Sequence, residues 1–206
     1  MSKRKLAVAV LMFTCAAAAQ DNGNRFDFAI SGSAVFSKKT TSSSGSVTDT
    51  PTKSTAFTGT FRYHFRPKHA VDVNLGRTRN SQIFFVPPNT YRVLASISEF
   101  TVDYSFSPLT IGKLHPFVFA GGGALHFSPG STFIDTFPTS IPVATQTSLA
   151  FLYGGGADYP VWRMISARVQ YRGLFFKEPD FGVPALFFTG AKGHLAEPSA
   201  GIVLRF

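Results

Sequence analysis

The sequence predicts an all-β fold: a closed antiparallel up-and-down transmembrane β-barrel of about eight strands, with short turns at one end and long loops at the other. Apolar and polar residues alternate along most of the chain, which is the pattern of strands with two unlike faces. Phenylalanine accounts for 23 of the 206 residues, while charged residues make up only 15%. Beyond residue 20, no uninterrupted apolar stretch reaches the length of a transmembrane helix. The apolar groups must therefore lie on alternate positions of strands.

The first three predicted strands follow from this alternation. Residues 26–36 place Phe and Ile opposite Asp and Ser, and residues 57–65 place Phe and Tyr opposite Thr, Arg and His. Residues 71–75 place Val and Leu opposite Asp and Asn. The Ser- and Thr-rich segment between the first two strands is typical of a loop. Arg66-Pro67-Lys68 predicts a tight turn before the third strand.

Residues 91–106 and 117–127 form the fourth and fifth predicted strands. In the fourth, the apolar residues change phase near Ser98, which predicts a β-bulge. In the fifth, Phe and Leu share a face with two glycines of the run Gly121–Gly123. Glycine inside a strand relieves crowding where a small barrel bends or where large side chains approach. The Phe-rich faces are expected to meet lipid, since they are too aromatic for the inside of a small barrel.

The last three predicted strands span residues 149–159, 165–175 and 199–206. A turn at Pro160–Arg163 joins the first two of them. The final strand alternates as far as Phe206. An aromatic ring at the end of a strand suits the lipid–water interface, which favours a strand that closes a membrane barrel.

Four long connections are expected at the same end of the barrel, at residues 37–55, 78–90, 128–147 and 177–193. Long loops on one side and short turns on the other are typical of outer-membrane barrels. Any binding of a partner is expected on these loops, because loops on a rigid frame tolerate the variation that recognition requires. The Leu-Phe-Phe patch at residues 186–188 would support such a role if it is exposed.

Residues 1–19 have the features of a cleavable signal peptide. Lys3, Arg4 and Lys5 precede a short apolar stretch that ends in Ala17-Ala18-Ala19. Removing these three basic residues lowers the formal charge from +9 to +6, and the remaining charges are scattered, so no nucleic-acid partner is expected. The single cysteine lies in the same segment. Residues 20–206 are therefore expected to form one outer-membrane barrel domain without disulfides.

The faces opposite the aromatic ones carry charged side chains of both signs. The side chains expected inside the barrel are Asp27, Arg62, His64, Asp72, Glu99, Asp103, Asp158, Arg168, Arg172 and Arg205. An eight-stranded barrel is just wide enough for side chains to fill it, and buried charges must be paired. We therefore expect a salt-bridge network that plugs the interior; a narrow ion or proton path is the alternative.

Several tyrosines and the single tryptophan are candidates for aromatic girdles. Their rings combine an apolar body with a polar tip, which suits the headgroup level of a membrane. The candidates are Tyr63, Tyr104, Tyr159, Trp162 and Tyr171.

Three stretches resemble the eight-stranded outer-membrane β-barrels of the OmpA type. They are Pro116–Gly123, Tyr153–Tyr159 together with Ala167–Arg172, and the C-terminal strand. In the last stretch, Ile202, Leu204 and Phe206 look like the signal that the barrel-assembly machinery reads. The resemblance implies a bacterial outer-membrane location in contact with lipid and lipopolysaccharide. The resemblance is uninformative about activity, and no enzymatic activity is expected.

A possible exception is the His126-Phe127-Ser128 tripeptide, since outer-membrane lipid A deacylases are eight-stranded barrels with a lipid-facing His-x-Ser pair. In that family Asn follows the pair, whereas this chain has Pro129, and alternation predicts that His126 faces inward. The histidines show no metal-ligand spacing, and no cofactor or metal is expected.

The sequence therefore predicts a non-enzymatic structural or surface protein with loops for recognition or attachment. The alternatives are a narrow channel or transporter for small or apolar solutes and, more remotely, a lipid A-modifying hydrolase. The extracellular ligand is unknown from the sequence.

Overall fold

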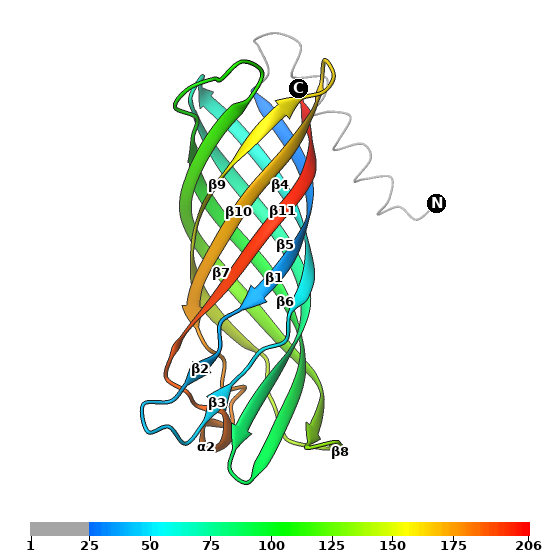
Figure 1. The fold of residues 1–206 in the computed structure, drawn as a ribbon, viewed down its shortest axis with the longest axis vertical. Coiled ribbons are helices and arrows are strands. Elements are labelled where there is room, and N and C mark those ends of the chain that lie inside the picture. Colours follow the sequence, from blue (N-terminus) through cyan, green and yellow to red (C-terminus); the bar gives the residue numbers. More distant parts are fainter. Residues whose placement is uncertain (1–24) are drawn as a thin grey trace, which may run out of the picture.

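The computed structural model describes residues 25–206. The sequence-predicted signal peptide, residues 1–19, lies outside the described residues. Eight long strands dominate the structure (Figure 1). They are β1 (Phe26–Ser37), β4 (Ser54–Arg66), β5 (His69–Val86), β6 (Asn89–Phe106), β7 (His115–Ile134), β9 (Gln146–Pro160), β10 (Ile165–Lys177) and β11 (Lys192–Arg205).

The sheet closes on itself, as the sequence predicts. Strand β1 pairs antiparallel with β4 on one side and with β11 on the other, where Phe28 lies opposite Leu204. Each remaining long strand also pairs with two neighbours. Closure leaves no open edge along the wall, and this is the arrangement that hydrocarbon requires, because lipid offers the backbone no hydrogen-bond partners. Among residues 25–206, no helix is both long and apolar enough to cross a membrane.

The two ends of the barrel differ as expected. The C-terminus and the connections that join β4 to β5, β6 to β7 and β9 to β10 lie at one end, here called the turn end (Figure 1). The opposite end, the loop end, carries four small elements (Figure 1). These elements are β2 (Thr40–Thr41), β3 (Thr48–Asp49), β8 (Phe137–Thr139) and α2 (Pro184–Phe187).

The expected second loop, at residues 78–90, is not a loop. Strands β5 and β6 continue in register as far as the pair Val86 and Asn89, so that only Pro87 and Pro88 form the turn. The alternation in this segment is weak because much of it extends beyond the main barrel wall, where neither face must be apolar.

The predicted bulge near Ser98 is also wrong. Val93, Ala95 and Ile97 are buried, in phase with the inward-facing Glu99. What changes near Ser98 is the character of the inward side chains of β6, which are polar towards the turn end and apolar towards the loop end. The irregular register lies instead between Val93 and Ala95, against β7.

Most aromatic faces point outward, as predicted, but the face of β7 is reversed. Phe57, Phe100 and Ile202 lie on the outer wall with more than half of each side chain exposed. On β7, however, Phe117, Phe119 and Phe127 are buried inside the barrel. Glycines make this possible, since a Cβ on Gly154 of the neighbouring strand β9 would meet the ring of Phe119. The rule that rings face lipid therefore holds for most of the wall and fails in this strand.

Candidate functional site

The interior of the barrel has a polar half at the turn end and an apolar half at the loop end. Arg168 and Arg172 are among its largest fully buried side chains, beside Phe84, Phe127 and Phe187. The polar half corresponds to the salt-bridge network expected from the sequence. The apolar half, which includes Phe84, Phe127 and Phe187 and is here called the apolar plug, was not predicted from the sequence.

Two arginine–aspartate pairs hold the polar half at the turn end. Arg62 of β4 donates through Nε and Nη2 to both carboxylate oxygens of Asp72 on β5, at 2.7 and 2.6 Å. Arg168 of β10 binds Asp158 of β9 in the same way, at 2.7 and 2.9 Å. Paired bonds of this kind join planar groups at fixed geometry. Arg205 adds a third bond to Asp158, from Nη2 at 3.0 Å.

The two arginine pairs meet at one aromatic ring. The guanidinium carbon of Arg62 lies 4.6 Å from the centroid of the Phe117 ring, and that of Arg168 lies 4.8 Å away. A cation over an aromatic face is attracted by the partial negative charge that the ring quadrupole places on that face, more strongly where water is excluded. Inside the barrel, Phe117 thus contacts two cations and also stacks on the Phe119 ring.

Arg172 connects strands across the interior. From β10 it donates to Glu99 on β6, to Glu197 on β11 at 2.9 Å and to the Thr58 hydroxyl on β4 at 3.1 Å. Its side chain is 2% exposed. A guanidinium this deeply buried is tolerable only because carboxylates compensate its charge. The bonds to β4 and β6 join strands that are not neighbours of β10 in the sheet, so the Arg172 side chain spans the interior of the barrel.

Amide and hydroxyl groups complete the polar half. Asn74 donates to Asp103 at 2.6 Å and to the Thr101 hydroxyl at 3.2 Å, while its carbonyl accepts a bond from Thr60 at 2.7 Å. Asp72 and Asp103 are directly opposite each other on β5 and β6. Two carboxylates in that relationship repel each other, and the bonds from Arg62 and Asn74 compensate them separately.

The turn end opens into a hollow of about 900 Å³. His64 lies here, with Nε2 2.9 Å from an oxygen of Asp27, and Arg205 lies on the same wall. His64 and Arg205 are about a quarter exposed, unlike the rest of the network. This hollow ends at the two arginine pairs, because Arg62 and Asp158 are part of its lining.

The loop end is closed by aromatic side chains from the last long loop. Phe187 of α2 stacks on Phe84 of β5, with centroids 4.4 Å apart, and meets Tyr91 edge-on at 5.9 Å. Phe181 lies edge-on to Phe84 and to Phe127, at 6.3 and 6.4 Å. Phe181 and Phe187 are fully buried. The loop is therefore folded into the mouth of the barrel as part of its core.

Gln146 at the start of β9 anchors this loop. Its side-chain oxygen accepts hydrogen bonds from the backbone N–H groups of Asp180 and Phe181, both at 3.0 Å. The Leu186-Phe187-Phe188 patch is consequently split: Phe187 is buried, and Phe188 is about half exposed. These three residues therefore do not form a continuous exposed patch.

Two acidic groups are buried in the loop-end structure, outside the membrane-spanning strands. Burial raises the pKa of Glu178 to about 7. Burial, and secondly the nearby Glu178 charge, raise the pKa of Asp49 on β3 well above its usual value. One oxygen of each carboxylate is buried and finds no hydrogen-bond partner among residues 25–206. Glu178 is therefore the group of this loop from which a pH dependence of its packing is expected.

One important member of the network was missed by sequence reasoning. Glu197 is 3% exposed and binds Arg172. The final predicted strand begins only at Ser199, whereas β11 starts at Lys192. Continuing the alternation of Ser199, Gly201, Val203 and Arg205 backwards through the proline would have placed Glu197 inside.

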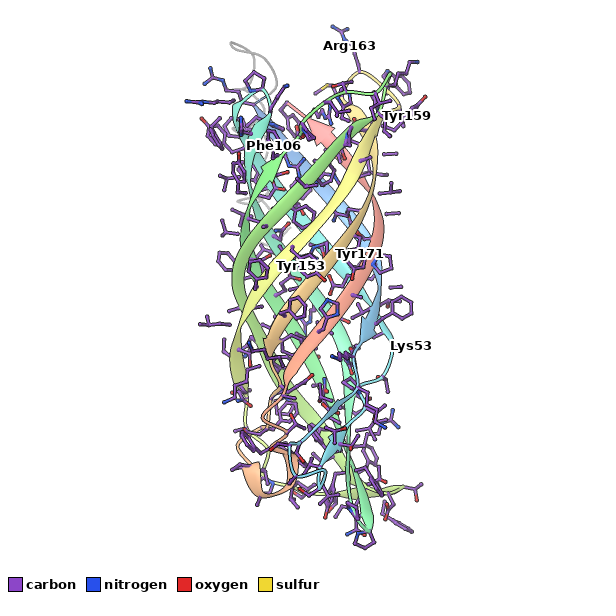
Figure 2. All side chains as sticks on the ribbon, turned by 60° about the vertical axis from the view of Figure 1, so that its left-hand side comes forward. Lys53, Phe106, Tyr153, Tyr159, Arg163 and Tyr171 are labelled. Carbon is purple, nitrogen blue, oxygen red and sulfur yellow. The ribbon has the colours of Figure 1, made fainter. Side chains whose placement is uncertain are left out.

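The candidate girdle residues are all exposed. Trp162 occupies the short turn between β9 and β10, and Tyr159 lies near the turn end (Figure 2). Tyr171 lies about half-way along the barrel, next to Tyr153 (Figure 2). Of the C-terminal residues, Ile202 and Leu204 face outward on β11, and the backbone N–H of Phe206 donates to the carbonyl of Phe26 at 2.8 Å.

His126 faces outward, which corrects the predicted inward orientation. The error follows from the reversed face of β7, since His126 lies between the inward residues Leu125 and Phe127. Its Nδ1 lies 2.9 Å from the Thr147 hydroxyl of β9. Across the described chain, residues 25–206, no group of three or more His, Cys, Asp or Glu residues is arranged to hold a metal ion.

Comparison with known proteins agrees with this architecture. Residues 6–204 match the family model described as outer membrane protein beta-barrel domain. The chain belongs to this family. Membership of the outer membrane protein beta-barrel family places the protein in the bacterial outer membrane, and its turn end, with the C-terminus, corresponds to the periplasmic side. None of the curated protein sequences compared with the chain matches it.

Solved structures of this family's fold are similar to the chain over most of its length. Neisserial surface protein A (NspA) has a TM-score of 0.53 and 16% sequence identity, covering 90% of this chain and all of NspA. Ail, the attachment invasion locus protein of Yersinia pestis, in complex with a heparin analogue, has a TM-score of 0.48 and 16% identity, with 90% and 100% covered. OprG from Pseudomonas aeruginosa has a TM-score of 0.48 and 15% identity, with 90% and 98% covered. The likeness to NspA shows a shared fold.

Proposed function

We propose that this outer-membrane barrel is a sealed scaffold that presents its loop end at the cell surface for recognition or attachment. The observation that carries the proposal is the double closure of the interior. Arg172 crosses the polar half to bind Glu99, Glu197 and Thr58, and Phe181 and Phe187 fill the loop end. An interior occupied in both halves favours a structural role over passage of solutes.

The loop end also offers a firm binding surface. The β5–β6 hairpin is fixed to the end of β7, because Thr90 and Asp135 exchange two hydrogen bonds, at 2.6 and 3.0 Å. Phe85 near the hairpin tip and Phe137 of β8 are exposed to 48% and 75%. Exposed aromatic rings on a rigid support are typical anchors of protein interfaces. These two rings are where we expect a partner to bind.

The test combines conductance with attachment. Purified protein in planar bilayers is expected to show no conductance above background, and cells that display it are expected to adhere to a surface or host-cell layer. Replacing Phe85 and Phe137 by Ser should abolish adhesion without affecting assembly. The matched control replaces Leu109 and Ile111 by Ser as well. These are exposed apolar residues of a turn at the opposite end, and their replacement should leave adhesion unchanged. Steady conductance of the intact protein would instead support the channel alternative.

We further propose that residues 1–19 direct export and are removed. Lys3–Lys5, the apolar stretch and the alanines before Gln20 support this. The mass of protein purified from outer membranes is expected to correspond to a chain that starts at Gln20. A mass that retains Met1 would contradict the proposal.

A further inference from the structure

The outer wall changes from apolar to basic at the loop end of three neighbouring strands, β10, β11 and β1. The outward side chains of β10 pass from Val169 and Phe175 to Lys177. Those of β1 pass from Phe36 to Lys38, just beyond the strand, and those of β11 end at Lys192. We call Lys38, Lys177 and Lys192 the lysine rim. All three side chains are exposed.

The centre of the lysine rim is a pair of like charges. Lys177 and Lys192 are directly opposite each other on β10 and β11. Side chains in that relationship begin about 5 Å apart, and like charges there destabilise a sheet. Within residues 25–206, every ion pair involves other residues. The two ammonium groups therefore lack a carboxylate among these described residues to compensate them.

The surroundings of the pair add positive charge and apolar surface. The backbone N–H of Lys38 donates to the His194 carbonyl at 3.0 Å, which brings the basic end of β1 beside β11. The ammonium of Lys177 lies 6.0 Å from the centroid of the Phe188 ring. The nearest acid in sequence, Glu178, is buried. An anion placed here would touch cations and have apolar neighbours on its membrane side.

A second basic group lies close by on the same wall. The ammonium of Lys53, before β4, lies 5.7 Å from the Phe36 ring (Figure 2). Phe36 is the last outward ring of β1 before Lys38. Basic groups thus border the apolar wall itself, on the membrane side of the tips of the loops. Long basic side chains at such a border extend towards the headgroups of the lipid.

We propose that the lysine rim binds the phosphate groups of a phosphorylated glycolipid in the outer leaflet of the membrane. The position favours a lipid over a soluble polysaccharide, because Lys177 and Lys192 end the same faces that carry Phe175 and Ile202 towards hydrocarbon. The phosphate groups of the ligand compensate the charges of Lys177 and Lys192. Its acyl chains cover the aromatic rings on the membrane side of these lysines. This binding site goes beyond the proposed function and requires no attachment partner.

The test measures binding of diphosphorylated lipid A to the full barrel in detergent by native mass spectrometry. Each basic group near an anionic lipid surface is worth about a fivefold change in affinity, so Lys177→Gln together with Lys192→Gln should weaken binding roughly 25-fold. Fully dephosphorylated lipid A should bind the variant and the wild type equally. The matched control, Lys68→Gln with Lys113→Gln, removes two exposed cations at the turn end and should leave binding unchanged.

A charge reversal separates binding from folding. In Lys177→Glu, the new carboxylate would face Lys192 and form a cross-strand ion pair. This variant should be at least as resistant to heat as the wild type in detergent, and yet should lose binding of diphosphorylated lipid A. Loss of stability in parallel with binding would instead mean that Lys177 has a structural role, and would overturn the proposal.

Three other results would also overturn the proposal. The first is equal affinity of the wild type and the Lys177/Lys192 double variant for diphosphorylated lipid A. The second is full competition by inorganic phosphate at the concentration of the lipid, which would identify a site for free phosphate. The third is lysine-dependent binding of soluble heparin without lysine-dependent binding of lipid, which would identify a polysaccharide site.

Discussion

Phe187 stacks on Phe84 with ring centroids 4.4 Å apart, and this contact joins a four-residue helix in a loop to a strand of the barrel wall. Both rings are fully buried. The loop between β10 and β11 is thereby part of the core, and its buried rings lie in the mouth of the barrel. A surface loop that is folded into the core can display its exposed residues in one fixed arrangement.

Replacing Phe187 by Ala should release this loop. Loss of a buried phenylalanine costs about 3 kcal/mol, because transfer energy is lost and a cavity remains. Residues 178–191 should then become sensitive to protease while the barrel stays folded. Limited proteolysis followed by mass spectrometry measures the effect. Phe188→Ala is the control, since that neighbouring ring is about half exposed, and an equal effect of both substitutions would contradict the packing described.

Replacing Arg172 by Met should destabilise the whole barrel. Glu99 and Glu197 would keep buried charges without their partner, which costs about 4 kcal/mol. The thermal unfolding of the barrel in detergent should shift clearly downward. Arg163→Met, in an exposed turn (Figure 2), should have little effect.

A triple variant tests whether the cost comes from charge. Arg172→Met combined with Glu99→Gln and Glu197→Gln removes the uncompensated carboxylates and should recover most of the lost stability. If the triple variant is no more stable than the single one, shape and not charge explains the role of Arg172.

Alternation in the sequence was sufficient to place most of this network. Arg62 and Asp72, for example, lie on faces whose opposite sides are plainly apolar, and a strand has only two faces. Strand β7 could not be oriented in the same way, because the destination of Phe117 depends on two arginines from other strands. Such contacts between residues far apart in the sequence do not affect the alternation of apolar and polar residues along the strand. The one local indication was that Gly121 and Gly123 share a face with large rings, which is typical of a crowded interior.

The apolar plug was unpredictable for a related reason. Phe181 and Phe187 belong to a segment rich in Gly and Pro, without alternation. Their burial depends on the space left by Phe84 and Phe127 at the mouth of the barrel. Only the closed barrel defines that space.

Adding a methyl group to Gly154 should disturb the contact between β9 and its neighbours. A Cβ there would meet the carbonyl oxygen of Tyr171 and the ring of Phe119. A backbone oxygen cannot move without separating strands, so Gly154→Ala should cost about 2 kcal/mol by overpacking. Gly32→Ala is the matched control, because its nearest contact would be the Phe57 ring at 4.0 Å. Thermal unfolding in detergent compares the two, and equal midpoints would contradict the close approach.

The docking of the last long loop should weaken as pH rises. The pKa of Glu178 is raised by burial to about 7, against 4.5 for the free side chain. Between pH 4.5 and about 7, Glu178 is therefore protonated in the docked loop and ionised in the released loop. The contribution of this proton to docking is fully present below about pH 4.5 and is lost as pH rises through about 7. The full difference is about 3 kcal/mol.

A spin label at Ala185, an exposed residue of α2, reports the docking directly. With Cys15 replaced by Ser, the single label at Ala185→Cys should be more mobile at about pH 8 than at about pH 5, with a midpoint near 7. Glu178→Gln should keep the label immobile at both values, because a neutral amide does not titrate. Mobility that changes equally in the Glu178→Gln variant would assign the pH dependence to another group.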